Sequence, residues 1–189
     1  MIIYLHGFAS SQNSLKAQQI QNIEDIDVLC FDLDVEPEKA LEQISSTIKR
    51  YQDEDIMLMG SSLGGFYALL MAKEFNLPAV LINPSIYPYK TLARFVGVKQ
   101  NNYSKDEIVV YKQRYIEQLA SMSFEGVNQE RILLMLQTGD KDLDYKLALS
   151  ALPCAQHFIQ EGGNHSFEDF NHHFDLIRSF YGKFFVIKS

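Results

Sequence analysis

Six short hydrophobic runs recur along the chain, at residues 2–5, 27–31, 56–59, 79–82, 132–136 and 157–160. Most of these runs lack the alternation of polar and apolar residues that a half-exposed strand shows, and this is typical of strands covered on both faces. Segments with helical spacing lie between them. Because strands that alternate with helices form parallel sheets, we expect an α/β fold of about six mostly parallel strands with helices on both faces.

Two of the intervening segments carry apolar residues at every third or fourth position, as an amphipathic helix does. The first begins at Pro37, which suits the first turn of a helix. Its apolar stripe consists of Leu41, Ile44, Ile48 and Tyr51. The stripe of the second, near the end of the chain, consists of Phe167, Phe170, Phe174, Ile177 and Tyr181. We interpret both stripes as faces of helices packed on the sheet rather than as ligand sites.

A long connection, residues 86–128, separates two of the predicted strands. It has a helical pattern at 107–122 and carries several tyrosines, namely Tyr87, Tyr89, Tyr103, Tyr111 and Tyr115. Insertions at one edge of a sheet often cover a site, because loops converge there. We therefore expect a single domain over residues 1–189 with a small cap-like insertion at about 86–128. Its tyrosines would form either an aromatic acyl pocket or packed surface.

Composition and charge exclude several classes of protein. The chain is 47% hydrophobic and 22% charged, which argues against disorder, and its formal net charge of −7 without a Lys/Arg cluster argues against a nucleic-acid partner. It has no apolar stretch of about 20 residues, so we expect no membrane span. Two cysteines and a start without a basic leader favour a cytoplasmic protein.

A glycine- and serine-rich turn at 60–65 follows one predicted strand and precedes a predicted helix. A phosphate-binding loop needs a lysine after its second glycine, where this chain has Phe66. A dinucleotide fingerprint needs a third glycine that is missing here. The pattern G-x-S-x-G of a nucleophile elbow fits, with Ser62 between Gly60 and Gly64, and this spacing selects Ser62 over Ser61.

A serine nucleophile needs a base and an acid that orients the base. In the α/β-hydrolase arrangement they follow the serine in the order acid, then histidine, each after a later strand. Asp140 follows the run at 132–136, and His165 follows the run at 157–160. Asp142 and Asp144 lie in the same loop as Asp140. We favour Asp140 because it stands nearest the end of the strand.

The other histidines are weaker candidates for the base. His157 falls inside a predicted strand, where we expect a core or partly buried residue. His172 and His173 are adjacent on the predicted final helix, so they point apart and form neither a metal pair nor a good base. We expect no metal site.

Two backbone N–H groups are expected to stabilise the oxyanion that develops in acyl transfer. One belongs to Leu63, which follows the nucleophile at a helix N-terminus, where the helix dipole also favours negative charge. The other is expected from Phe8, since Gly7 would let the backbone of this early loop approach the substrate. We interpret His6 as a residue that braces the loop.

Five segments together resemble the YqiA-type small bacterial esterases of the α/β-hydrolase superfamily. They are "YLHGF" with "SS" following, "GSSLGG", "LPAVLINP", "QTGD" followed by "LDY", and "EGGNHSF". The resemblance covers nearly the full length. It implies a three-layer α/β-hydrolase fold, esterase activity, and Ser62, Asp140 and His165 as the triad. The chain opens on the strand that feeds the oxyanion loop, so we expect a reduced fold without the first two strands of a full-size hydrolase.

The motifs predict a serine esterase that cleaves carboxylic esters through an acyl-enzyme on Ser62. An acyl-CoA thioesterase or another acyl hydrolase on the same triad is the alternative. A non-catalytic binding protein on a hydrolase scaffold is less favoured, because such proteins usually lack a triad member. The expected partner is a small-molecule ester or thioester, and the chemistry needs no cofactor.

Overall fold

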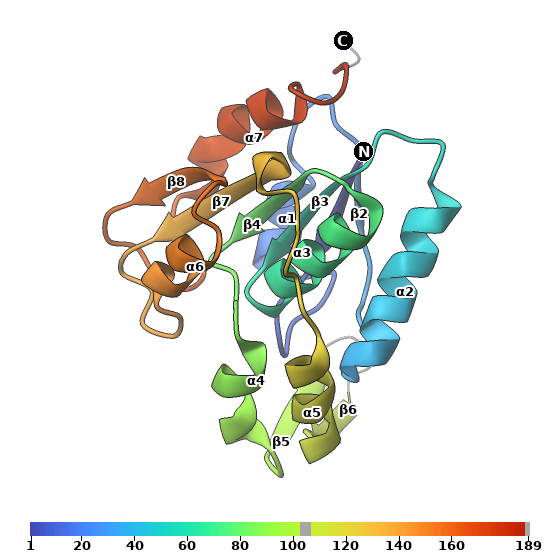
Figure 1. Ribbon diagram of the computed structural model, residues 1–189, viewed down its shortest axis with the longest axis vertical. Coiled ribbons are helices and arrows are strands. Elements are labelled where there is room, and N and C mark those ends of the chain that lie inside the picture. The colour runs from blue at the N-terminus through green and yellow to red at the C-terminus, as the bar shows by residue number, and fades with distance from the viewer. Residues whose placement is uncertain (103–106, 188–189) are drawn as a thin grey trace.

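The computed structural model describes residues 1–102 and 107–187, so Tyr103 lies outside the described residues. Its main feature is a parallel sheet of six strands in the order β2-β1-β3-β4-β7-β8 (Figure 1). The strands are β1 (Ile2–Leu5), β2 (Val28–Cys30), β3 (Met57–Ser61), β4 (Ala79–Ile82), β7 (Ile132–Gln137) and β8 (Gln156–Gln160). All six hydrophobic runs thus form strands, which confirms the predicted parallel sheet.

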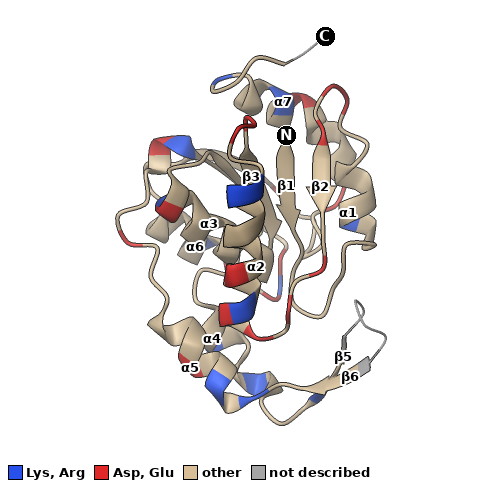
Figure 2. Cartoon of the chain, turned by 90° about the vertical axis from the view of Figure 1, so that its right-hand side faces the viewer, with Lys and Arg blue, Asp and Glu red and all other residues tan. Residues whose placement is uncertain are grey.

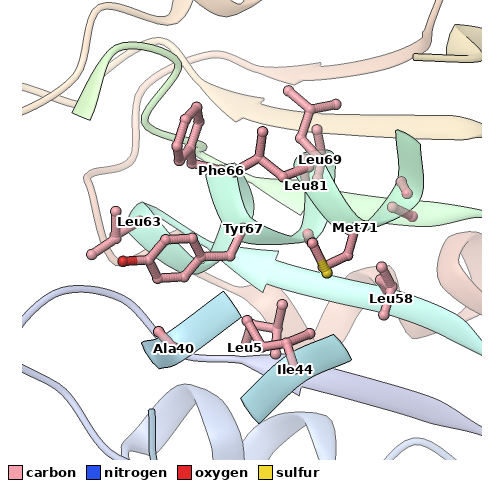
Figure 3. Close-up of a cluster of buried hydrophobic side chains, with 14 of the residues drawn as sticks. Leu5, Ala40, Ile44, Leu58, Leu63, Phe66, Tyr67, Leu69, Met71 and Leu81 are labelled. Carbon is pink, nitrogen blue, oxygen red and sulfur yellow. The ribbon is translucent and has the colours of Figure 1, made fainter. Parts of the chain in front are cut away.

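Helices cover both faces of the sheet, and successive residues of each central strand enter opposite cores. Ile3 and Leu58 face one core, which contains α2 (Pro37–Arg50) and α3 (Leu63–Phe75) (Figure 3). Ile2 and Met57 face the other core, where residues of α1 (Leu15–Ile20) and α7 (Phe174–Tyr181) pack. Because both side-chain directions lead into a core, these strands read as continuous apolar runs in the sequence.

The edge strand β8 is exposed on one of its faces. Its residues alternate between partly buried and exposed, and the side chain of His157 is exposed. The prediction that His157 is a core or partly buried residue is therefore wrong. Its Nε2 lies 2.7 Å from the carbonyl oxygen of Leu152, in the turn that precedes β8.

The helix predicted at Pro37 is confirmed as α2, which begins at that residue. Ile44 and Ile48 of the predicted stripe are buried, together with Ala40, while Leu41 and Tyr51 pack partly buried at the margin. The centre of the buried face is thus the row of Ala40, Ile44 and Ile48, and Leu41 and Tyr51 lie at its edge. Its burial against α3 and the sheet accounts for the helical spacing of the apolar residues.

The final aromatic stripe forms less helix than predicted. Helix α7 begins at Phe174, and a 3-10 turn, η3 (Phe170–His173), precedes it. Phe167 and Asp169 have positive φ angles of 62° and 56°, which no helix accommodates. His172 and His173 therefore lie in the turn, not on the helix. Phe167 and Phe170 are nevertheless buried against the sheet with the α7 side chains, so their role in packing is as expected.

The described residues of the connection at 86–128 form five elements. They are α4 (Pro88–Thr91), the 3-10 turn η1 (Ala93–Phe95), β5 (Lys99–Asn102), β6 (Glu107–Val110) and α5 (Gln113–Ser121). A further 3-10 turn, η2 (Gln129–Arg131), follows the connection. The predicted helix at 107–122 is wrong in its first part, because Ile108, Val109 and Val110 are β-branched and pair with β5 as an antiparallel hairpin. Of these elements, α4, β5, β6 and α5 lie together at one end of the molecule (Figure 1).

Helix α6 (Tyr145–Ala151) connects β7 to β8 on the same face of the sheet as α3. None of the helices in the described part of the chain combines the length and the apolar character that crossing a bilayer requires.

Within the sheet, β3 lies between β1 and β4, so the glycine turn that follows β3 is at the centre of the sheet.

Candidate active site

The turn between β3 and α3 has an unusual backbone conformation and needs glycine on either side of Ser62. Ser62 adopts φ 53° and ψ −119°, an unusual conformation for a residue with a side chain. A Cβ atom at Gly60 would fall on the backbone of Gly64, and one at Gly64 would fall on the carbonyl group of Leu5 in β1. Both glycines are therefore required for the turn to lie this close to the neighbouring strand.

The two adjacent serines face different partners. The hydroxyl of Ser61, the last residue of β3, lies 2.9 Å from the Tyr4 hydroxyl, and Tyr4 is buried in the core that contains α1 and α7. The Ser62 Oγ lies 3.1 Å from Nε2 of His165. Ser61 is thus held by a structural contact, and Ser62 contacts an imidazole.

The imidazole of His165 contacts a carboxylate on its other side. Its Nδ1 lies 2.8 Å from Oδ2 of Asp140, whose side chain is 1% exposed, whereas that of His165 is 31% exposed. The other carboxylate oxygen, Oδ1, accepts hydrogen bonds from the backbone N–H groups of Asp142 (2.9 Å) and Leu143 (3.0 Å). Asp140 is therefore fixed by its own loop and holds His165 in turn.

The other acidic candidates in this loop have different partners. Asp144 is the N-cap of α6, and its Oδ1 accepts a hydrogen bond of 3.0 Å from the Lys146 backbone N–H. The Asp142 carboxylate lies 3.7 Å from a guanidinium nitrogen of Arg94, and both side chains are largely exposed. Of the three acids, the structure brings Asp140 to the histidine.

Burial and the mutual contact shift the pKa values of this pair in opposite directions. Burial alone would raise the pKa of Asp140, but the hydrogen bond from His165 and the backbone N–H groups of its loop lower it below the ordinary value. Burial alone would lower the pKa of His165, but the hydrogen bond and charge of Asp140, with the charge of Asp142, raise it above the ordinary value. The pair therefore favours an ionised carboxylate beside a basic imidazole.

The same carboxylates offer atoms that a metal ion could use, since ligand atoms of Asp140, Asp142 and His165 lie within 4.8 Å of one another. Nδ1 of His165 and Oδ2 of Asp140 are already engaged with each other at 2.8 Å. This hydrogen bond suits an acid that orients a histidine better than it suits two ligands of one ion.

The loop after β1 brings its backbone against the serine. A Cβ atom at Gly7 would lie 3.2 Å from the Cβ of Ser62, so the absence of a side chain allows this approach. Across residues 1–102 and 107–187, neither the backbone N–H of Phe8 nor that of Leu63 donates to a protein acceptor. Leu63 is the first residue of α3, where the helix dipole favours an anion. Both N–H groups are therefore available to a hydrogen-bond acceptor.

His6 braces this loop, in agreement with its interpretation from the sequence. Its Nδ1 lies 2.9 Å from the Gly7 carbonyl oxygen, and its Nε2 accepts a hydrogen bond of 3.1 Å from the Leu33 backbone N–H. Burial lowers the pKa of His6, which keeps the ring neutral and able to accept this bond.

Comparison with known proteins places this chain. The model of the uncharacterised protein family UPF0227 matches residues 1–182. The chain belongs to the UPF0227 family. The family resemblance predicted from the motifs is thereby confirmed. A UPF0227 protein of Yersinia pseudotuberculosis is 27% identical, over 95% of this chain and 98% of that relative, and a UPF0227 protein of Yersinia pestis shows the same values.

Solved structures with the same fold are more distant in sequence. Est1E from Butyrivibrio proteoclasticus with bound ferulic acid is 16% identical with a TM-score of 0.71, covering 97% of this chain and 86% of its own. Alpha/beta hydrolase domain-containing protein 10 from mouse is 16% identical with a TM-score of 0.69, covering 96% of this chain and 89% of its own. These likenesses confirm the predicted α/β-hydrolase fold.

Two buried amides that the sequence analysis did not single out hold the histidine loop of this UPF0227 protein. The Asn83 Nδ2 donates to the carbonyl oxygens of Asn164 (3.0 Å) and His165 (3.3 Å), and its Oδ1 accepts from the Gln137 backbone N–H at 2.9 Å. The Gln137 Oε1 accepts from the backbone N–H groups of Asn164 and Glu168, both at 2.9 Å. In the sequence, these two residues could have been recognised as polar residues at the ends of two otherwise apolar strands.

A cavity of about 230 Å³ opens beside Ser62 and His165. Its apolar walls are Phe8, Leu63, Leu92, Phe95 and Leu143. The Phe8 ring lies 5.1 Å from the Phe95 ring, centroid to centroid, so the connection at 86–128 packs directly on the loop that follows β1. None of the described tyrosines of that connection lines this cavity, and Tyr111 and Tyr115 are buried in the core. Tyr87 and Tyr89 line a different cavity, beside Phe66 and Phe124.

Proposed function

We propose that this protein is a serine hydrolase that cleaves carboxylic esters through an acyl-enzyme on Ser62. The observation that carries the proposal is the hydrogen-bonded series from Ser62 through His165 to Asp140, with distances of 3.1 and 2.8 Å. Such a series turns a weakly nucleophilic hydroxyl into an effective one, because the base takes the proton as the hydroxyl attacks. The free N–H groups of Phe8 and Leu63 supply the electrostatic part of the same chemistry.

In the first half of the reaction, Nε2 of His165 takes the proton of the Ser62 hydroxyl while Oγ attacks the ester carbonyl carbon. The carbonyl oxygen becomes an oxyanion that the backbone N–H groups of Phe8 and Leu63 bind. The carbon–oxygen bond to the alcohol then breaks, and the protonated imidazole gives its proton to the departing oxygen. The product of this half is an ester between Ser62 and the acyl group.

In the second half, His165 takes a proton from a water molecule that attacks the acyl-enzyme. Collapse of the second oxyanion releases the acid and returns the proton to Ser62. Asp140 accepts a hydrogen bond from Nδ1 throughout, which presents Nε2 as the base and stabilises the imidazolium that forms in each half. The proposed chemistry uses no cofactor.

Similarity to esterases supports an ester as the substrate. Besides Est1E, an esterase of Pyrococcus furiosus shares the fold with a TM-score of 0.72 at 16% identity, covering 97% of this chain and 82% of its own. The triad alone does not separate esters from thioesters, because fold and triad serve many substrates. Whether the protein is an esterase or a thioesterase therefore has to be decided by comparing its turnover of esters with its turnover of thioesters.

A turnover panel tests the proposal. It compares p-nitrophenyl esters of increasing acyl length with acyl-CoA thioesters of the same lengths, for the native protein and the Ser62→Ala variant. We expect hydrolysis of the esters and a loss of roughly 10⁴-fold or more in kcat on substitution, as for other triads. Undiminished hydrolysis by the variant would contradict the proposal. Faster turnover of the thioesters than of the esters would show that the substrate is a thioester.

A further inference from the structure

The proposed reaction assigns one side of the site to the alcohol part of the ester. His165 must protonate the departing oxygen, so that oxygen lies within hydrogen-bonding reach of Nε2, about 3 Å away. The cavity of about 230 Å³ is lined by both Ser62 and His165. The alcohol that leaves from this position extends into that cavity. This assignment rests on the proposed function.

A separate and smaller cavity is assigned to the acyl part of the ester. A second cavity of about 40 Å³ shares Phe8 and Leu63, the two proposed oxyanion donors, with the larger one. Its walls include Leu33 and Val35, together with the acidic residue Asp34. The apolar walls and the small volume suit a short hydrocarbon group.

The larger cavity contains a cation that the proposed mechanism does not use. Arg94 lines it, and the side chain is 65% exposed, with its guanidinium carbon 4.9 Å from the centre of the Phe95 ring. Among the described residues, the carboxylate that pairs with it is that of Asp142, 3.7 Å away, which is too long for a hydrogen bond. Within the described residues the Arg94 side chain makes no hydrogen bond, so its N–H donors are available to a ligand.

The charge around Arg94 differs from that of the rest of the molecule. Residues 86–128 carry six Lys and Arg against four Asp and Glu, whereas the whole chain has a net charge of −7. Figure 2 shows Lys and Arg beside α5, at the end of the molecule where α4, β5 and β6 also lie. A negatively charged substrate that the acidic body repels would therefore find its favourable contact at this end.

We propose that the site takes esters of a short acyl group with an alcohol that carries negative charge, and that Arg94 binds this charge. The planar guanidinium matches a carboxylate or a phosphate with two parallel hydrogen bonds. The stacking on Phe95 holds the guanidinium in the alcohol cavity. Asp142 opposes the same charge from the other wall, so Arg94 and Asp142 have opposite effects on selectivity.

The test compares phenyl acetate with 3-acetoxybenzoate, which has the same acyl group and a carboxylate on the alcohol part. The measured quantity is the ratio of kcat/KM for the charged ester to that for the neutral one. We expect Arg94→Gln to lower this ratio about tenfold, the scale of one charge-assisted contact. Arg94→Lys should retain most of the ratio, and Asp142→Asn should raise it.

Arg50→Gln is the matched control, since it removes the same charge from an exposed position at the last residue of α2. We expect it to change the ratio less than twofold. A third ester, phenyl hemisuccinate, places the carboxylate on the acyl part, and its ratio to phenyl acetate should respond much less to Arg94→Gln.

Two results would overturn the inference: an unchanged ratio for 3-acetoxybenzoate in Arg94→Gln, or an equal or larger fall for phenyl hemisuccinate. Either would leave the proposed function intact, because phenyl acetate turnover and its loss in Ser62→Ala report on that separately. If the native protein hydrolysed none of the three esters but did hydrolyse longer p-nitrophenyl esters, the inference would fail and the proposed function would stand. If it hydrolysed no ester of either set, both would fail.

Discussion

At the scale of single residues, the three acids after β7 have separate roles that their contacts define. Asp140 contacts His165 at 2.8 Å, Asp144 caps α6, and Asp142 faces Arg94. We expect Asp140→Asn to reduce kcat by about 10³- to 10⁴-fold, because an amide no longer favours the required tautomer of the histidine. Asp142→Asn should cost less than about tenfold on a neutral ester. Steady-state kinetics of both variants checks the ranking, and the reverse order would refute the role of Asp140.

The pH dependence of the reaction follows from the raised pKa of His165. The neutral imidazole is the base, so kcat/KM should fall as the pH drops through a pKa above the ordinary histidine value. The charge of Asp142 contributes to this rise. Removing it by Asp142→Asn lowers the pKa, and the acid limb of the pH profile should move to lower pH. A pH–rate profile of each protein measures this shift, and movement to higher pH would contradict the assignment.

At the scale of elements, Asn83 after β4 and Gln137 at the end of β7 hold the loop that carries His165. Asn83 has a positive φ of 39°, which aspartate also tolerates. In Asn83→Asp, carboxylate oxygens face the carbonyl oxygens of Asn164 and His165, so the loop loses two donors and gains repulsion. We expect kcat to fall about tenfold or more with little change in KM, together with a loss of about 1–3 kcal/mol of stability.

Asn128→Asp is a matched control for this substitution, since Asn128 caps η2 through its side-chain oxygen, which aspartate retains. Kinetics and thermal unfolding are measured for both variants. If Asn83→Asp lost stability but kept the native kcat, Asn83 would stabilise the fold without positioning the histidine.

Local pattern predicted some elements well and others poorly, for identifiable reasons. The central strands were readable because both faces are covered, and α2 because its stripe packs on α3. The start of α7 was not readable, because positive φ angles at Phe167 and Asp169 break a stripe that the sequence leaves continuous. The helical spacing over 107–122 concealed β6, where strand pairing of β-branched residues prevails over the apolar period.

At the scale of the whole molecule, the parallel sheet explains why the candidate site could be assembled from the sequence. The carboxyl ends of β1, β3, β7 and β8 meet at one edge of the sheet, so the loops that follow them converge. The motifs of these loops were legible one by one. The hydrogen bonds of Asn83 and Gln137 and the place of Arg94 in the cavity were not, because they depend on which loops pack together and on how the 86–128 connection packs on them.

The central claim is that Ser62, and not the adjacent Ser61, is the nucleophile. The most direct measurement is labelling of the folded protein with a fluorophosphonate, followed by mass spectrometry of the peptide that contains both serines. We predict one adduct, on Ser62, that is lost in Ser62→Ala and persists in Ser61→Ala, which removes only the contact with Tyr4. An adduct on Ser61, labelling that survives in Ser62→Ala, or a folded native protein that is not labelled would contradict the account.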